Sequence, residues 1–260
     1  MTVIKCRREG DDKMDLRTAT AAAVCVLSAC VGVSDSTKPE SPRVTVINKG
    51  FSGRNTRNAL QLLDKEILPL KPQHVIVYFG MNDAMNSGNL LGLADYEANL
   101  QAIVKKLSDN GAKTVALVTI NPVIEEYVQA RHPKHPQKEH LQAYLATYDQ
   151  AVRSIAQEGK LPLIDLRAII ETNGGAVISE KCLIRCEQNG GGKDGVHLTP
   201  AAYTLLGKRA FEVIGERVKH GDTVVCFGDS LTFGAGAKGA GTVTGETYPA
   251  ALQRSFDQRQ

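Results

Sequence analysis

The stretch from Thr223 to Leu231 constrains the fold of this chain more than any other part of the sequence. Its first five residues, 223–227, form a nearly continuous apolar run, which is typical of a strand buried on both faces of a parallel sheet. Gly228, Asp229 and Ser230 follow directly, so the strand ends in a tight turn that carries a hydroxyl group. Because open α/β folds bind their ligands at the carboxyl ends of parallel strands, we expect Ser230 to lie beside such a crevice.

Apolar runs and helical spacings alternate along the rest of the chain. Further strands are predicted at 44–48, 74–79, 114–120 and 161–166, and helices at 56–68, 95–110, 138–157, 199–219 and 248–258. Asp95 is the predicted N-cap of the second helix, and Thr199 followed by Pro200 indicates the start of the fourth. Five alternations of strand and helix predict an α/β fold in which helices cover both faces of a parallel sheet.

Charge and cysteine spacing argue against two classes of protein. The net charge is only +3 and no run of Lys or Arg is longer than two residues, so nothing indicates a nucleic-acid partner. The six cysteines include no Cys-x-x-Cys pair and no cluster with zinc-finger spacing. Cys182 and Cys186 are either a disulfide, in an oxidising compartment, or two reduced thiols. Cys226, inside the predicted strand, is expected to be a small core residue.

The first part of the chain has the pattern of an export signal. Residues 14–33 have a short basic start and then an apolar run, which is too short for a membrane span but long enough for a secretory signal. The run ends Leu27-Ser28-Ala29-Cys30, which resembles the lipobox of bacterial lipoproteins and implies a lipidated Cys30. The protein would then be lipid-anchored or periplasmic in a bacterial cell envelope. The alternative is an Ala-rich first helix of a cytoplasmic protein. We expect a signal-like segment at 1–30, a Pro-containing linker at 31–43 and one domain at 44–260.

Five residues at predicted strand and helix edges have the chemistry of ester hydrolysis. Serine is a poor nucleophile unless a base takes its proton, and His197 is the proposed base for Ser230. Asp194 lies three residues before His197 and can orient the imidazole. The backbone N–H groups of Ser230 and Gly53 and the side-chain amide of Asn82 are the proposed donors to the oxyanion. Taken singly, each residue has a structural alternative: a turn hydroxyl, a hydrogen-bonded loop pair or an Asx-turn.

The four blocks that contain these residues resemble those of the SGNH (GDSL) esterase/lipase family. They read Gly228-Asp229-Ser230-Leu231, Gly53, Gly80-x-Asn82 and Asp194-x-x-His197. The resemblance implies a flavodoxin-like three-layer α/β/α fold with a five-stranded parallel sheet, an acyl-enzyme intermediate, and no metal or organic cofactor. It also implies small acyl esters, thioesters, acetylated sugars or lipids as substrates. The family carries the serine block first, whereas here it comes last, which predicts a circular permutation of the domain.

Two other patterns in the sequence resemble binding motifs. Gly234-x-Gly236-x-x-Gly239 matches a dinucleotide fingerprint, but the chain ends before a second strand could complete the βαβ unit, so a flexible rim beside Ser230 is expected instead. His132, His135 and His140 are interleaved with prolines and lack an acidic partner, so we expect a solvated loop and no metal site. The alternatives to an esterase are an envelope polysaccharide O-acyltransferase of the same fold and a catalytically silent binding lipoprotein. The sequence does not indicate an oligomeric state.

Overall fold

The computed structural model describes residues 43–259. The predicted signal-like segment at 1–30, the lipidation at Cys30 and all of the linker at 31–43 except Arg43 lie outside the described residues. Within the described range, no helix is both long enough and apolar enough to cross a membrane.

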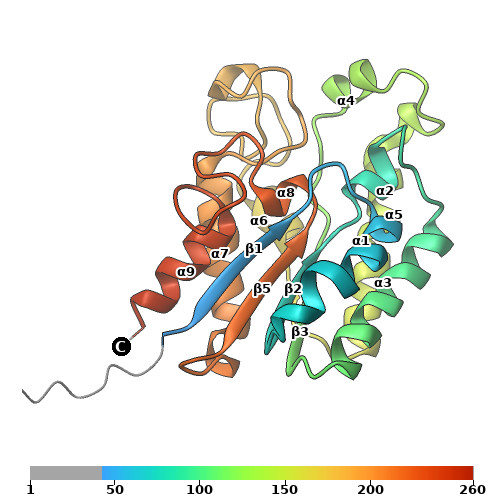
Figure 1. Ribbon diagram of the computed structural model, residues 1–260. Coiled ribbons are helices and arrows are strands. Elements are labelled where there is room, and N and C mark those ends of the chain that lie inside the picture. The colour runs from blue at the N-terminus through green and yellow to red at the C-terminus, as the bar shows by residue number, and fades with distance from the viewer. Residues whose placement is uncertain (1–42, 260) are drawn as a thin grey trace, which may run out of the picture. The chain divides into compact units, whose positions relative to one another are not determined.

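Five parallel strands form one sheet, as predicted (Figure 1). Their order is β1-β5-β2-β3-β4, and their bounds are β1 Thr45–Gly50, β2 His74–Tyr78, β3 Thr114–Val118, β4 Leu163–Ile164 and β5 Thr223–Gly228. Strand β5 pairs with both β1 and β2, and its five residues from Val224 to Gly228 are buried. This central position explains the apolar run, because neither face of the strand meets water. The predicted strand at 161–166 is wrong in length, because Asp165 caps a helix that begins at Leu166.

The strand order agrees with the predicted flavodoxin-like fold. Counted from β5, it becomes 2-1-3-4-5, which is the order of flavodoxin-like sheets. The last helix, α9 Tyr248–Asp257, lies along the first strand: the Gln253 side chain accepts from the Val46 N–H (2.8 Å) and donates to the Val44 carbonyl (3.1 Å). The end of α9 and the start of β1 therefore lie close together, as the circular permutation requires. The permutation itself stays a prediction.

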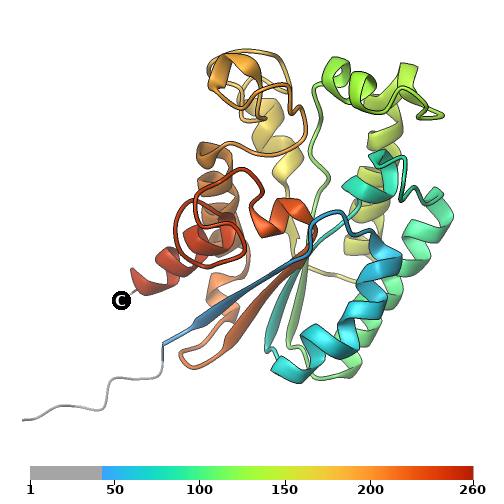
Figure 2. The same cartoon turned by 45° about the horizontal axis from the view of Figure 1, so that its top comes forward.

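Helices cover both faces of the sheet, which confirms the three-layer architecture (Figures 1 and 2). One layer consists of α1 Thr56–Leu62, α3 Leu93–Asp109 and α5 Leu141–Glu158, and the other of α7 Pro200–Ile214 and α9, with α6 Leu166–Thr172 packed on α7. Short helices α2 Met81–Met85, α4 Glu125–Arg131 and α8 Ser230–Phe233 lie among the connections at the carboxyl ends of the strands. Single turns of 3-10 helix lie at Leu68–Leu70, Lys138–His140, Glu187–Asn189 and Gly215–Arg217.

Several predicted helix boundaries shift. The predicted helix at 56–68 is α-helical only to Leu62 and continues as a π-helical turn over Leu63–Ile67. The predicted cap Asp95 is wrong: α3 begins at Leu93, Gly92 is the N-cap, and Asp95 lies in the first turn. The predicted start of α7 is confirmed, because Thr199 accepts a hydrogen bond from Ala202 N and Pro200 is the first helical residue.

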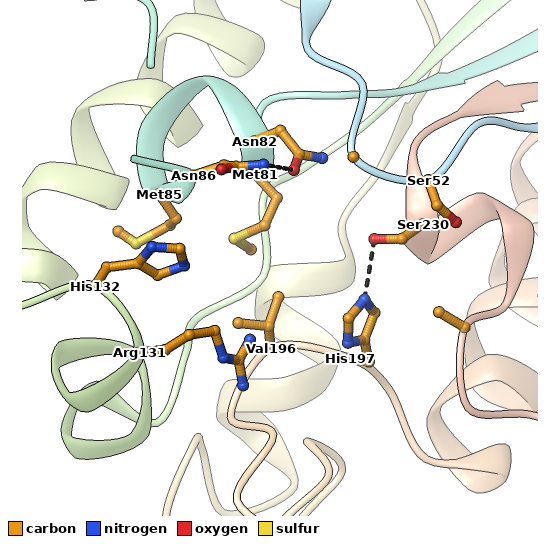
Figure 3. A pocket seen from close by; sticks show the side chains of 12 residues that line it. Ser52, Met81, Asn82, Met85, Asn86, Arg131, His132, Val196, His197 and Ser230 are labelled. Atoms are coloured by element: carbon orange, nitrogen blue, oxygen red, sulfur yellow. Dashed lines mark hydrogen bonds between the residues drawn. The ribbon is translucent and has the colours of Figure 1, made fainter. Parts of the chain in front are cut away.

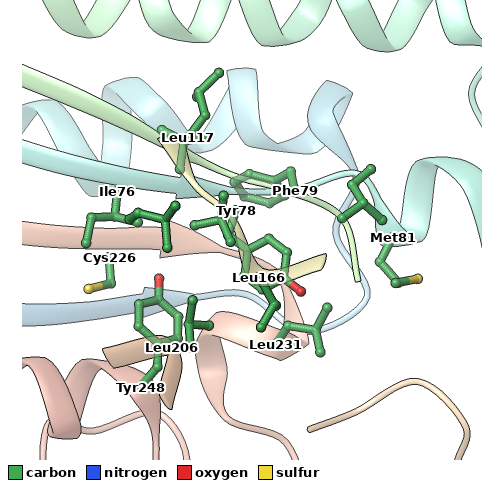
Figure 4. Packing of buried hydrophobic residues seen from close by; sticks show 14 of the residues in the cluster. Ile76, Tyr78, Phe79, Met81, Leu117, Leu166, Leu206, Cys226, Leu231 and Tyr248 are labelled. Atoms are coloured by element: carbon green, nitrogen blue, oxygen red, sulfur yellow. The ribbon is translucent and has the colours of Figure 1, made fainter. Parts of the chain in front are cut away.

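The core surrounds β5 on both faces (Figure 4). The fully buried Cys226 points toward Tyr248 of α9, so its predicted role as a core residue is confirmed. The next residue, Phe227, points to the opposite face, where its ring meets that of Phe79 edge to face at 4.8 Å. Burial of a side chain of this size contributes about 1.5–3 kcal/mol. Strand β5, which leads to Ser230, is therefore packed between the two helical layers.

Candidate active site

Ser230 is the first residue of α8, directly after the end of β5. The turn is tight because Asp229 caps this helix by accepting from the Leu231 N–H (2.9 Å). Gly228 allows the close approach of strand and helix, since a Cβ there would lie 2.1 Å from Thr232 Oγ1 and 2.5 Å from the Tyr78 carbonyl oxygen. The sequence thus places a half-buried hydroxyl at the carboxyl edge of the sheet, as expected.

His197 and Asp194 complete a hydrogen-bonded chain with Ser230 (Figure 3). His197 Nε2 lies 2.9 Å from Ser230 Oγ, and His197 Nδ1 lies 2.9 Å from Asp194 Oδ2. Asp194 Oδ1 also accepts from the main-chain N–H groups of Val196 (3.0 Å) and His197 (2.8 Å). Although burial alone would raise the pKa of Asp194, these hydrogen bonds hold that pKa well below its usual range. The carboxylate is therefore charged and fixed on the imidazole.

The loop that carries Asp194 and His197 is anchored on a neighbouring segment. Arg185 exchanges main-chain hydrogen bonds with His197 (2.8 Å) and Gly195 (2.9 Å). The Arg185 side chain also donates to the carbonyl of Gly236 in the glycine-rich loop (2.6 Å). Arg131 of α4 donates to the main-chain carbonyl of Asp194. Because Arg185 and Arg131 hold the loop from two separate segments, the acid–base pair does not depend on its own short turn for its position.

Gly53 and Asn82, the predicted oxyanion donors outside the serine turn, line the same cleft as Ser230. Gly53 follows β1 and lines the same cleft as Ser230, and Asn82 projects from the first turn of α2. The Asn82 amide donates to the Arg54 carbonyl (3.1 Å) and to Asp229 Oδ2 (3.0 Å). An amide nitrogen has two hydrogens, so both are engaged in these two bonds. One of these bonds has to be exchanged before Asn82 can serve an oxyanion.

Two buried carboxyl groups adjoin these donors. Burial raises the pKa of Asp229 to about 7, and burial also raises the pKa of Asp83 to about 6. Asp83 accepts from both the N–H (3.0 Å) and the hydroxyl of Thr56, so it joins the start of α1 to α2. Asp229 belongs to the serine block and Asp83 directly follows the Gly80-x-Asn82 block, but neither was a predicted site residue.

The cleft in front of Ser230 has a volume of about 380 Å³. Its walls between α2 and the His197 loop are apolar, and its far end carries Arg131 and His132 (Figure 3). Its lining residues are Ser52, Gly53, Met81, Asn82, Met85, Asn86, Arg131, His132, Val196, His197, Ser230 and Ala235. Sequence reasoning missed Asn86, although a run rich in asparagine after a buried strand, at 82–89, was a usable signal.

The structure also tests the predictions for the glycine-rich loop, the histidine loop and the cysteines. The glycine-rich loop does border Ser230, because Ala235 lines the cleft. His135 is not solvated as expected: it is buried, and its Nε2 lies 2.7 Å from the Ala84 carbonyl. Cys182 and Cys186 are free, buried thiols. Within residues 43–259, no three His, Cys, Asp or Glu side chains gather as a metal ion would require.

Known proteins resemble this chain in sequence and in fold. The model of the GDSL-like lipase/acylhydrolase family matches residues 32–205, which contain Gly53, Asn82, Asp194 and His197, while Ser230 lies beyond the match. A GDSL esterase/lipase of Oryza sativa subsp. japonica is 28% identical over 48% of this chain and 52% of its own length, so the match spans about half of that relative. An isoamyl acetate-hydrolysing esterase 1 homologue of Homo sapiens is 26% identical over 66% of this chain and 69% of its own. The crystal structure of a GDSL-like lipase from Bacteroides thetaiotaomicron has the same fold, with a TM-score of 0.51, 19% identity, and coverage of 65% of this chain and 75% of that one.

Proposed function

Since the chain belongs to the GDSL-like lipase/acylhydrolase family, we propose that it is a serine esterase that hydrolyses short-chain acyl esters through an acyl-enzyme. The observation that carries the proposal is the unbroken chain of hydrogen bonds from Asp194 through His197 to Ser230, at the edge of an open cleft.

The first half of the reaction acylates Ser230. Its Oγ attacks the ester carbonyl carbon while His197 Nε2, 2.9 Å away, takes the hydroxyl proton. The oxyanion of the tetrahedral intermediate accepts from the N–H groups of Ser230 and Gly53 and from the Asn82 amide, which exchanges one of its present acceptors for the substrate oxygen. When the intermediate collapses, His197 gives its proton to the alkoxide that leaves. Asp194 holds the ring and stabilises the imidazolium.

The second half reverses these roles with water. His197 takes a proton from a water molecule, whose oxygen attacks the acyl carbon on Ser230. The same three donors serve the second oxyanion, and Ser230 leaves with the proton returned by His197. The described residues supply every group that these steps use, so no cofactor enters the scheme.

The cleft favours a small acyl group. Its volume of about 380 Å³ is at the lower end of the range for small-molecule sites. Met81, Met85 and Val196 provide an apolar wall next to Ser230, which suits an alkyl chain of a few carbons. The human relative named above is called an isoamyl acetate-hydrolysing esterase homologue, which supports acetyl esters as the first class to test.

A series of 4-nitrophenyl esters from acetate to decanoate tests the proposal on the full chain. We expect the highest kcat/KM for acetate to butyrate, and a loss of turnover of about 10⁴-fold or more in Ser230→Ala and His197→Ala. Ser154→Ala is the matched control, because Ser154 is a half-buried residue of α5 whose hydroxyl accepts a hydrogen bond from the Gln150 side chain (3.4 Å) and does not line the cleft. Turnover that survives in Ser230→Ala contradicts the mechanism, and a maximum at decanoate contradicts the substrate class.

We also propose that the chain is anchored to a bacterial membrane through a lipid on Cys30. The support is the sequence pattern of residues 14–33. In bacteria fed a clickable fatty acid, the full-length protein is expected to become labelled, the Cys30→Ala variant to remain unlabelled, and a Cys25→Ala control to be labelled normally. Equal labelling of the Cys30→Ala variant, or no labelling of the unaltered protein, contradicts the anchor.

A further inference from the structure

Two asparagines in the segment after β2, Asn82 and Asn86, are joined by a hydrogen bond between their side-chain amides. Asn86 Nδ2 donates to Asn82 Oδ1 over 3.1 Å, one helical turn apart (Figure 3). The oxygen of the Asn82 amide is therefore on the Asn86 side, and its nitrogen faces the Arg54 carbonyl and Asp229. Only this orientation presents an N–H donor toward the side of the cleft where Ser230 lies.

The direction of these bonds is fixed at both ends. The Gly88 main-chain N–H donates to Asn86 Oδ1 (3.1 Å), and a main-chain N–H can only donate. The Asn86 amide therefore has to turn its nitrogen toward Asn82. At the other end, the Arg54 carbonyl can only accept, so it requires the Asn82 nitrogen. A flipped amide at either asparagine would set two donors or two acceptors against each other.

The same segment also holds the second proposed donor. Asn89 Nδ2 donates to the Gly53 carbonyl over 2.7 Å. The main-chain carbonyl of Asn89 in turn accepts from the Asn55 side chain (2.8 Å), so the turn after α2 and the turn after β1 are joined in both directions. Gly53 has a φ of +74° and open space where a Cβ would be, so side-chain packing does not hold it. The bond from Asn89 adds to the bond from the Arg54 N–H to the Phe51 carbonyl (3.2 Å), so both polar groups of the peptide after Gly53 are held.

We propose that the turn Asn86–Asn89 is the positioning device of the oxyanion hole. Asn86 determines which way the Asn82 amide faces, and Asn89 holds the carbonyl of Gly53, the residue whose N–H is the second proposed donor. This proposal rests on the function proposed above. Its physical basis is that an oxyanion donor contributes most when it is oriented before the charge develops. Neither asparagine contacts the reacting atoms, so both are positioning residues.

Asn86→Asp gives the sharpest test. An aspartate keeps an oxygen for the Gly88 N–H but turns a second oxygen toward Asn82 Oδ1, so two acceptors repel each other and the Asn82 amide is displaced from its orientation. We expect kcat for 4-nitrophenyl acetate to fall by about 10²–10³, the cost of one oxyanion donor, with KM unchanged. Asn86→Ala leaves the Asn82 amide held only by its bonds to the Arg54 carbonyl and Asp229, without a repelling oxygen, and is expected to lower kcat only about tenfold. If Asn86 served only to hold the turn, Asn86→Ala would be the more damaging of the two variants, because only the alanine loses the bond from the Gly88 N–H.

A double-mutant cycle with Asn82→Ala separates orientation from other effects. Once residue 82 has no amide, residue 86 has nothing to orient. We therefore expect the Asn82→Ala/Asn86→Asp protein to be no slower than Asn82→Ala alone. Losses that multiply in the double variant, or a wild-type kcat in Asn86→Asp, overturn the proposal.

Further variants supply the controls. Asn110→Asp removes an exposed amide that donates to the Lys106 carbonyl at the end of α3, and it is expected to leave kcat unchanged. Asn89→Ala is expected to lower kcat about tenfold at constant KM, and it tests the proposal even if Asn86→Asp fails to fold. Ser230→Ala distinguishes a failure of the proposed function from a failure of the positioning role. If the Ser230→Ala variant keeps its turnover, the proposed function fails. If it is inactive while Asn86→Asp and Asn89→Ala match the unaltered protein, only the positioning role fails.

Discussion

The two buried carboxyl groups beside the cleft predict an unusual dependence of stability on pH. Asp83 and Asp229 are 0% and 1% exposed. Burial raises the pKa of Asp83 from 3.8 to about 6 and that of Asp229 from 3.8 to about 7. In the unfolded chain both side chains return to ordinary values, near 3.9.

The sign follows from the number of bound protons. Between about pH 4 and pH 7 the folded chain keeps protons that the unfolded chain has already lost, so the free energy of unfolding falls as the pH rises. A difference of one pKa unit corresponds to about 1.4 kcal/mol. Between pH 5 and pH 8 the titration of Asp83 therefore lowers the free energy of unfolding by about 1.4 kcal/mol, and that of Asp229 lowers it by about 3 kcal/mol. The pKa values of Asp194 and Asp222 are lowered, so the titration of these two groups makes the free energy of unfolding rise with pH. This opposite effect is confined to pH values below about 4.

Urea unfolding at pH 5 and pH 8 measures this difference. The free energy of unfolding is expected to be about 4 kcal/mol lower at pH 8. Asp83→Asn keeps an oxygen for Thr56 and removes the titration of residue 83. The free energy of unfolding of this variant is therefore expected to fall by only about 2–3 kcal/mol between pH 5 and pH 8. Asp109→Asn is the control, because the Asp109 side chain is 58% exposed and its variant is expected to show the full loss. Equal or greater stability at pH 8, or the same pH dependence in Asp83→Asn, refutes the reasoning.

Two further predictions concern the site and the core. In Asp194→Asn, the side-chain oxygen stays with the two main-chain N–H groups, and the new NH₂ meets His197 Nδ1. The imidazole then carries its proton on Nε2 and cannot take one from Ser230, so kcat measured with 4-nitrophenyl acetate is expected to fall about 10⁴-fold. In Gly207→Ala, the new Cβ would lie 2.5 Å from Ala251 Cβ, which forces α7 and α9 apart. Overpacking of about 1–3 kcal/mol outweighs the gain in helix propensity of about 1 kcal/mol, so a lower thermal unfolding midpoint is expected.

The fold was predictable where the sequence signal is local and long. The apolar run of β5 and the Thr199-Pro200 start of α7 each lie within a few adjacent residues, and the structure confirms both. Helices α2, α4 and α8 were missed because none is longer than seven residues, too few to show a helical period. Strand β4 was overestimated because its apolar residues continue into α6, where Asp165 changes the backbone from strand to helix.

Within the site, what could be predicted was the set of reacting groups. Motif spacing named Ser230 and His197, and the structure brings them together across 33 positions of sequence. The groups that orient them could not be found in the same way. Asn89 holds Gly53, 36 positions earlier, only because the ends of β1 and β2 meet at one edge of the sheet. Likewise, His135 becomes buried because its loop folds onto α2, a contact that no local pattern indicates.

Trapping the covalent intermediate tests the central claim most directly. The full-length protein is mixed with 4-nitrophenyl acetate, quenched in acid within milliseconds and digested for mass spectrometry. We expect one acetyl group on the peptide that contains Ser230, none in Ser230→Ala, and far slower acetylation in His197→Ala. Acetylation at another residue with equal turnover in Ser230→Ala would contradict the account.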